Sequence, residues 1–149
     1  MQKKFRHVSY ERVVSGPGLR MIYEFLIEKG YESESQEVKE AMQERDPSIV
    51  ISEFGIQDRD KACSRVVDWF LSFLGAEAGN LALKFLSLGG IYLGGGMPPR
   101  YAQRFMQSEF LTSFIHKGRF KDLLESIPIY IVMNADTALL GAASFAREL

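Results

Sequence analysis

Apolar residues recur every three or four positions along much of this sequence, which is the spacing of amphipathic helices. The longest such segment covers 58–86, and shorter ones cover 19–29, 36–45, 100–107 and 109–116. We expect 58–86 to form a long, largely buried central helix. The shorter segments predict further helices, with 36–45 on the surface.

Other stretches carry weaker or shorter signals. They are a helical turn over 10–14 capped by Ser9, a break at 15–18, an apolar piece over 49–54 that ends at Gly55, a basic turn at 117–120 and a helical turn over 121–126. Gly30 stands where a residue that ends the 19–29 helix would stand. The segment 138–149 predicts a helix of small residues that packs tightly against a sheet.

Two short runs of β-forming residues predict buried strands. Residues 91–93 lie between pairs of glycines, and residues 127–133 read IPIYIVM before a loop at 134–137. Strand, loop and helix follow one another twice, which is typical of an α/β fold. We therefore expect the two strands to pair in parallel, joined by a right-handed crossover.

Two glycines and an asparagine interrupt the long helical segment. Gly75 and Gly79 each cost about 1 kcal/mol relative to alanine inside a helix, so we expect another backbone to approach them closely. Asn80 stands among apolar residues. It is either a buried amide that pairs with backbone, which we favour, or a contact to a ligand.

The run LGGIYLGGGMPPR at 88–100 ends a predicted strand in three consecutive glycines, Gly94, Gly95 and Gly96. Glycines without Cβ atoms let a flat or charged ligand approach the backbone, so this turn is either a ligand seat or a bare strand-to-helix turn. The spacing fits neither a dinucleotide fingerprint nor a P-loop.

Composition narrows the range of partners. The chain has 149 residues, a net charge of −1 and 46% hydrophobic residues, enough for one domain over 1–149. This charge balance argues against nucleic acid and membrane-surface partners and favours small molecules or protein. No apolar run approaches about 18 residues and the polar start is not a secretory signal, so we expect a cytoplasmic protein.

Candidate nucleophiles and metal ligands are few. Cys63 is the single cysteine and lies in a helical apolar pattern, which favours a buried structural thiol over a nucleophile. His7 and His116 have no companions at metal-ligand or triad spacing, so we expect structural or surface roles for both. The sequence predicts no metal site.

Several motifs, taken together and in order, resemble the carboxyl-terminal half of bacterial-type glucokinase. They are HVSYERVVSGPGL at 7–19, AGNLAL at 78–83, GGIYLGGGMPPR at 89–100, KGRF at 117–120, IPIYIV at 127–132 and LLGAAS at 139–144. The resemblance covers almost the whole chain. It implies part of the large domain of a ribonuclease-H-like, actin-like ATPase fold, a long central helix with short parallel strands, and ATP and glucose bound between two lobes.

The resemblance also implies roles for individual residues. Glu11, in the Glu-x-x-x-Ser-Gly segment, would be the sugar-binding glutamate, and a carboxylate suits sugar hydroxyls because ionised acceptors make the stronger hydrogen bonds. Gly94, Gly95 and Gly96 would face the adenosine of ATP. Three neighbours of Glu11 would line the cleft: Ser15, Gly16 and Gly18.

Other parts of such an enzyme have no counterpart in this sequence. The family's phosphate loops, its Glu-x-x-His sugar segment and its general-base aspartate are missing, and no aspartate here lies in a comparable motif. The resemblance places the Mg²⁺ site mostly outside this chain. Residues 1–8 enter an amphiphilic pattern without a cap, which hints at truncation. We therefore expect no catalytic residue in this chain and a separate amino-terminal half as its partner.

Two functions follow as hypotheses. The chain is part of a glucokinase that phosphorylates glucose with ATP, and is inactive when isolated. Alternatively, it is a non-catalytic nucleotide- or sugar-binding fragment or subunit that needs a separate amino-terminal half. Exposed faces of the long helix, normally covered by that half, favour self-association into a homodimer.

Overall fold

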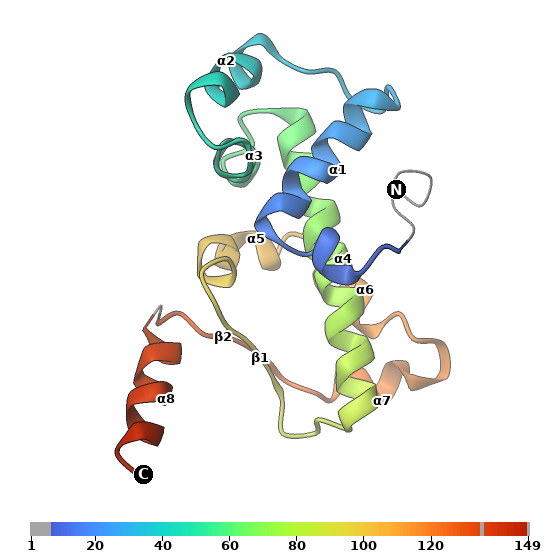
Figure 1. The fold of residues 1–149 in the computed structure, drawn as a ribbon. Helices are drawn as coiled ribbons and strands as arrows, with labels where there is room; N and C mark the ends of the chain where they lie inside the picture. Colours follow the sequence, from blue (N-terminus) through green and yellow to red (C-terminus); the bar gives the residue numbers. More distant parts are fainter. Residues whose placement is uncertain (1–6, 135, 149) are drawn as a thin grey trace.

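The structure, a computed structural model, describes residues 7–134 and 136–148 (Figure 1). Residues 1–6, which carry most of the uncapped amphiphilic start, lie outside the described residues. The elements are, in chain order, η1 (Tyr10–Arg12), α1 (Gly16–Glu28), α2 (Gln36–Glu44), α3 (Pro47–Ile56), α4 (Lys61–Phe85), β1 (Ile91–Leu93), η2 (Pro98–Tyr101), α5 (Ala102–Phe105), α6 (Phe110–Ile115), η3 (Gly118–Phe120), α7 (Lys121–Glu125), β2 (Ile129–Ile131) and α8 (Thr137–Ala146). The described chain is thus mostly helical, with two short strands.

Helix α4 is the central element, as its apolar periodicity predicted (Figure 1). It begins at Asp60, whose carboxylate accepts a hydrogen bond from the Cys63 N–H at 2.9 Å, and it ends at Leu86 in the left-handed conformation. Its buried face contacts α1, α3 and α6. By length and composition α4 could also cross a membrane, a test that buried core helices pass as well.

The glycines of α4 allow α6 to pack against it closely. A Cβ atom on Gly75 would lie 2.2 Å from the carbonyl oxygen of Phe110, and one on Gly79 would lie 2.3 Å from that of Phe114. No side chain fits at such distances. The predicted close backbone approach is confirmed, and it offsets the low helix propensity of glycine.

Helix α1 begins inside the segment that the sequence suggested would only break the chain. Ser15 is its N-cap, and the Ser15 hydroxyl accepts a hydrogen bond from the Gly18 N–H at 3.1 Å. Pro17 in the first turn suits the helix because its missing N–H would have no helical partner. The segment 15–18 therefore starts a helix, and the expected end of that helix at Gly30 (φ +69°) is confirmed.

Helix α3 corrects the expectation of a short apolar piece over 49–54. The helix runs from Pro47 to Ile56 and is capped by Asp46. Gly55 lies inside it, where a Cβ atom would meet the carbonyl oxygen of Cys63 at 2.5 Å. Glycine there serves the contact between α3 and α4, and does not end the element.

Strands β1 and β2 pair in parallel, as predicted, with Ile91 opposite Ile129 (Figure 1). The expectation that both strands are buried is wrong for one face of the sheet. Tyr92 and Tyr130 project from that face with 68% and 46% of their surfaces exposed, and their rings stack at 4.8 Å. Because side chains alternate along a strand, only the aliphatic residues of each strand turn toward the core.

Helix α8 does not pack against the sheet, contrary to the sequence prediction. None of its described residues is buried, and Figure 1 shows it at the end of the chain, apart from α4. Leu139, Leu140 and Phe145 are 58–70% exposed. The small residues of α8 permit tight packing, but within the described chain no element covers the helix.

Candidate functional site

The glycine turn after β1 borders a hollow of about 290 Å³. Gly95 has φ +103°, a backbone conformation that residues with a side chain rarely adopt. No atom lies within 4 Å of a Cβ placed on Gly94, Gly95 or Gly96. The glycines therefore present bare backbone to open space. The remaining lining residues are apolar or aromatic: Val14, Phe70, Leu74, Met97, Pro98, Tyr101 and Phe105.

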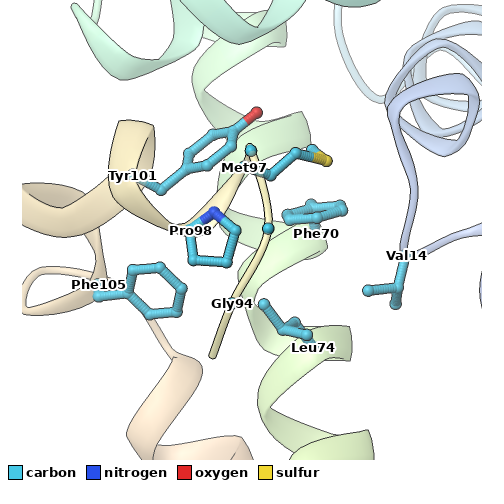
Figure 2. A pocket seen from close by; sticks show the side chains of 10 residues that line it. Val14, Phe70, Leu74, Gly94, Met97, Pro98, Tyr101 and Phe105 are labelled. Atoms are coloured by element: carbon cyan, nitrogen blue, oxygen red, sulfur yellow. The ribbon is translucent and has the colours of Figure 1, made fainter. Parts of the chain in front are cut away.

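Helix α4, the segment before α1, and η2 with α5 position the walls of this hollow. Figure 2 shows Phe70 and Leu74 of α4 behind the glycine turn, Val14 on one side, and Tyr101 and Phe105 on the other. The Tyr101 ring stacks on Phe70 with centroids 5.7 Å apart. An apolar hollow edged by backbone N–H and C=O groups suits a flat, partly polar ring system.

A buried hydrogen bond and an ion pair fix the wall formed by η2 and α5. The Tyr101 hydroxyl donates to the Ser52 hydroxyl of α3 at 2.8 Å, and burial raises the pKa of Tyr101. Arg104 donates to both carboxylate oxygens of Asp68 at 3.0 and 3.1 Å and to Asp58 at 2.7 Å. This fork ties α5 to α4 and neutralises the arginine outside the hollow.

Glu11 borders a second, more polar hollow of about 310 Å³. Its lining also includes Ser9, Arg12, Ser15, Pro17 and Met21. Glu11 is exposed in η1, so its carboxylate is accessible to a polar ligand. Ser15, which the sequence analysis expects to line a cleft, lies in the same lining as Glu11.

Of the two glycines near Glu11, Gly18 has a structural reason to be glycine and Gly16 shows none. A Cβ atom on Gly18 would lie 2.2 Å from the carbonyl oxygen of Val13, so the first turn of α1 needs glycine there. Gly16 is the first residue of α1 and has open space around it. Neither glycine is among the residues that line a hollow described above.

Neighbouring residues of the short segment between η1 and α1 line the two separate hollows. Val14 lines the apolar hollow and Ser15 lines the polar one. The chain thus places Glu11 and the glycine turn, which are more than 80 residues apart in the sequence, on two sides of one segment. That juxtaposition could not be derived from spacing alone.

Asn80 is the residue that the sequence reasoning misplaced. It is exposed, and its amide nitrogen donates to Glu77 at 2.9 Å and to the Tyr10 hydroxyl at 3.4 Å. Asn80 is therefore not a buried core amide. It links α4 to η1 and so supports the element that carries Glu11. Glu77 and Asn80 lie about one helical turn apart, and this polar pair in the sequence indicates an exposed face of the helix.

The remaining candidates show no sign of chemistry. Cys63 is buried, as predicted, and burial raises the pKa of its thiol, which disfavours the reactive thiolate. His7 and His116 are exposed. Over residues 7–134 and 136–148, no three His, Cys, Asp or Glu side chains gather where they could hold a metal ion. These described residues therefore offer no ready-made cluster of side chains for Mg²⁺.

Comparison of the sequence with known families and proteins gives a clear match. The family model described as glucokinase matches residues 1–149. The chain is 40% identical over 155 aligned positions to the glucokinase of Nostoc punctiforme, covering 97% of this chain and 46% of that protein. It is 38% identical to the glucokinase of Psychromonas ingrahamii, covering 95% of this chain and 41% of that protein.

A solved structure agrees with these matches. The crystal structure of a glucokinase from an Antarctic psychrotroph superposes with a TM-score of 0.80 and 28% sequence identity, covering 99% of this chain and 43% of that one. The mostly helical fold with two parallel strands thus matches part of a glucokinase. The chain spans less than half the length of the curated relatives it matches.

Proposed function

The chain belongs to the glucokinase family, and from that premise we propose that it serves the ATP-dependent phosphorylation of glucose to glucose 6-phosphate. In this proposal residues 1–149 are a carboxyl-terminal part of the large domain of a ribonuclease-H-like, actin-like enzyme. The observation that carries the proposal is the glycine turn, which presents bare backbone to an apolar hollow. The turn supplies the wall on which the adenosine of ATP rests.

The chemistry of the apolar hollow supports that assignment. Adenine is flat and carries ring nitrogens that pair with backbone groups, while its faces pack on side chains such as Met97 and Pro98. Among the residues that the structure describes, no lysine or arginine lines the hollow. We therefore assign the adenosine, and not the phosphates, to this chain.

Glu11 supplies one sugar-binding carboxylate in this proposal. An ionised carboxylate accepts hydrogen bonds from two sugar hydroxyls at once. The polar lining that Glu11 shares with Ser9 and Ser15 supports a ligand rich in hydroxyl groups. Ser15, Gly16 and Gly18 shape the start of α1 beside it.

Phosphoryl transfer also requires a metal ion, phosphate-binding groups and a residue that orients the nucleophile. We assign none of these to the present chain, and Mg²⁺ would be held by groups outside it. We therefore expect the isolated 149-residue chain to show no turnover with glucose and Mg-ATP in a coupled assay. Turnover by the purified chain would contradict this assignment.

A second candidate is a non-catalytic nucleotide- or sugar-binding fragment or subunit. The observation that favours it is the match to only 46% of the length of the Nostoc punctiforme glucokinase. Adding the portion of such an enzyme that this chain does not match distinguishes the two functions. Restored turnover supports the enzyme, and binding without turnover supports the binding fragment.

Calorimetric titration with ADP and then with glucose tests the site assignments. We expect ADP to bind, and Gly95→Val to weaken ADP binding by about tenfold or more, since a side chain at φ +103° strains the turn and fills the hollow. The matched control is Gly89→Ala, which has open space around it and lies outside the lining of the hollow. Equal ADP affinity in both variants would contradict the adenosine wall.

The sugar assignment is tested in the same way. If the isolated chain binds glucose, Glu11→Gln should weaken that binding and leave ADP binding unchanged, because the two hollows are separate. ADP binding without glucose binding would mean that the adenosine side forms alone and that the sugar site needs further groups. Glucose binding that is insensitive to Glu11→Gln would contradict the role of Glu11.

A further inference from the structure

Helix α5 contributes to one wall of the apolar hollow although it is too short to be stable alone. It has four residues and no side-chain hydrogen bond at its N-cap, and isolated helices of this length do not persist in water. Tyr101 and Phe105, four positions apart, both line the hollow. Contacts to other elements must therefore set the position of this wall.

Arg104 is the residue of α5 whose side chain hydrogen-bonds to distant elements of the described chain. Its guanidinium donates to the two carboxylate oxygens of Asp68 at 3.0 and 3.1 Å and, through another nitrogen, to Asp58 at 2.7 Å. The Arg104 side chain is only 13% exposed. A planar guanidinium that spans two carboxylates fixes an angle as well as a distance.

Asp68 lies on the same stretch of α4 that forms the opposite wall of the hollow. It precedes Phe70 by two positions and Leu74 by six, and both of these residues line the hollow. Neither Arg104 nor Asp68 belongs to the described lining. The bond between them therefore ties the two walls together from outside the hollow.

Asp58 holds the guanidinium from a second direction. It lies between α3 and α4 with φ +52°, a conformation that residues other than glycine rarely adopt, and the Ser64 hydroxyl donates to it at 2.9 Å. Tyr101 reaches α3 through its hydrogen bond to Ser52. The wall of η2 and α5 is thus attached to the corner between α3 and α4 as well as to α4 itself.

We propose that Arg104 is a positioning residue for the nucleotide, which fixes the width of the hollow by holding α5 to Asp68 and Asp58. This role rests on the proposed function, which assigns adenosine to the hollow. The charge of Arg104 is already shared between two carboxylates, so its contribution is to the shape of the hollow and not to the binding of phosphate. A wall that is free to move would have to be ordered when the ligand binds, and that ordering costs affinity.

Calorimetric titration with ADP and with adenosine separates the shape of the hollow from charge. We expect Arg104→Met, which keeps an unbranched apolar side chain and removes the guanidinium, to weaken the binding of both ligands by the same factor of about tenfold. Arg104→Lys keeps the charge but cannot form the two-pronged hydrogen bond to Asp68. It should therefore restore only part of the affinity that Arg104→Met loses.

Asp68→Asn tests whether Arg104 acts through its partner. The double variant Arg104→Met with Asp68→Asn should bind ADP no more weakly than Arg104→Met alone, because each side chain acts through the other. The matched control is Arg45→Met, which removes an ion pair to Glu53 at 2.6 Å outside the lining of the hollow. We expect it to leave ADP affinity unchanged. Thermal unfolding of each variant ensures that the titrations compare folded proteins.

Three results would overturn the role of Arg104. They are unchanged ADP affinity in Arg104→Met, a loss with ADP that is absent with adenosine, and an equal loss in Arg45→Met. The second result would make Arg104 a phosphate ligand, and the third would mean that general destabilisation lowers the affinity. If the unsubstituted chain binds neither ADP nor adenosine, the proposed function fails at this hollow and the role of Arg104 fails with it. Nucleotide binding that survives Arg104→Met overturns the role of Arg104 alone.

Discussion

Helices α3 and α8 have the same length and a similarly apolar composition, yet one is buried and the other is exposed. Each has ten residues. In α3 the side chains of Val50 and Ile51 are fully buried, whereas in α8 Leu139 and Leu140 are 70% and 58% exposed. Apolar residues therefore indicate that a surface is to be covered, but they do not indicate by which segment.

The difference arises from what surrounds each helix. Helix α3 contacts α1, α2 and α4. Its N-cap Asp46 accepts backbone hydrogen bonds, and its Gly55 allows close packing against α4. Helix α8 has no described residue in the core and no side-chain hydrogen bond at its N-cap. The helices around α4 bury a shared apolar core, whereas α8 and one face of the sheet leave large apolar side chains exposed.

The largest effect should come from removing buried side-chain volume in α3. Ile51→Ala is expected to lower the free energy of unfolding by about 2–5 kcal/mol, because it leaves a cavity in a fully buried site. The matched change Leu140→Ala in α8 should cost less than about 0.5 kcal/mol. Urea unfolding followed by circular dichroism measures both. Equal losses would mean that α8 is covered in solution.

A glycine occurs in each helix and gives a second matched pair. Gly55→Ala should destabilise the protein by about 1–3 kcal/mol, since its Cβ would lie 2.5 Å from the Cys63 carbonyl oxygen. At Gly141 no atom lies within 4 Å of an added Cβ. Gly141→Ala should therefore stabilise the helical state of α8 by up to about 1 kcal/mol. Thermal unfolding and helical content measure the two effects, and opposite signs are expected.

The N-caps of α3 and α8 should differ less in their effect on the free energy of unfolding. Asp46 accepts hydrogen bonds from the N–H groups of Ser48 and Ile49 at 2.8 and 3.3 Å, so Asp46→Ala should cost about 1 kcal/mol. Asp136 makes no such bond at the start of α8. Asp136→Ala should change the free energy of unfolding by less than about 0.5 kcal/mol. A comparable cost at both caps would contradict the contrast.

The smallest expected effect concerns the stability of the protein at low pH. A hydrogen bond from the Ser64 hydroxyl, and then the Arg104 guanidinium, lowers the pKa of Asp58 below its ordinary value of 3.8. The ionised Asp58 carboxylate stabilises the fold fully at pH values above its ordinary pKa, and this stabilisation is lost as the pH falls through the lowered pKa. Solvent weakens it, since the side chain is 60% exposed. Ser64→Ala should raise the Asp58 pKa in an NMR titration, and an unchanged pKa would contradict this cause.

Most of the fold could be predicted from local patterns. Apolar periodicity located α1, α2 and α4, and the cost of Gly75 and Gly79 predicted the close approach of another backbone, which the structure identifies as that of α6. The burial of the strands and the packing of α8 could not be predicted, because both depend on which segments are present to cover them. Gly55 was expected to end a short apolar piece because glycine often ends an element, but its packing against α4 explains why it lies inside α3.

The candidate site was predicted in part. The glycine turn was located as a candidate ligand seat from its sequence, and the structure adds the apolar hollow beneath it. Its walls come from α4 and from the segment before α1, far away in the chain, so spacing could not reveal them. Asn80 was misplaced because its neighbours are apolar, although Leu81 beside it is itself 41% exposed.

The only tryptophan gives the contrast between the two regions an optical consequence. Trp69 lies among Phe25, Tyr31 and Phe73, with ring centroids 6.3–6.5 Å away, and none of these rings belongs to the sheet or to α8. Its fluorescence therefore reports on the environment of α1 and α4. Loosening of α8 would change the far-ultraviolet dichroism before the emission changes, so the two signals together distinguish local opening from global unfolding.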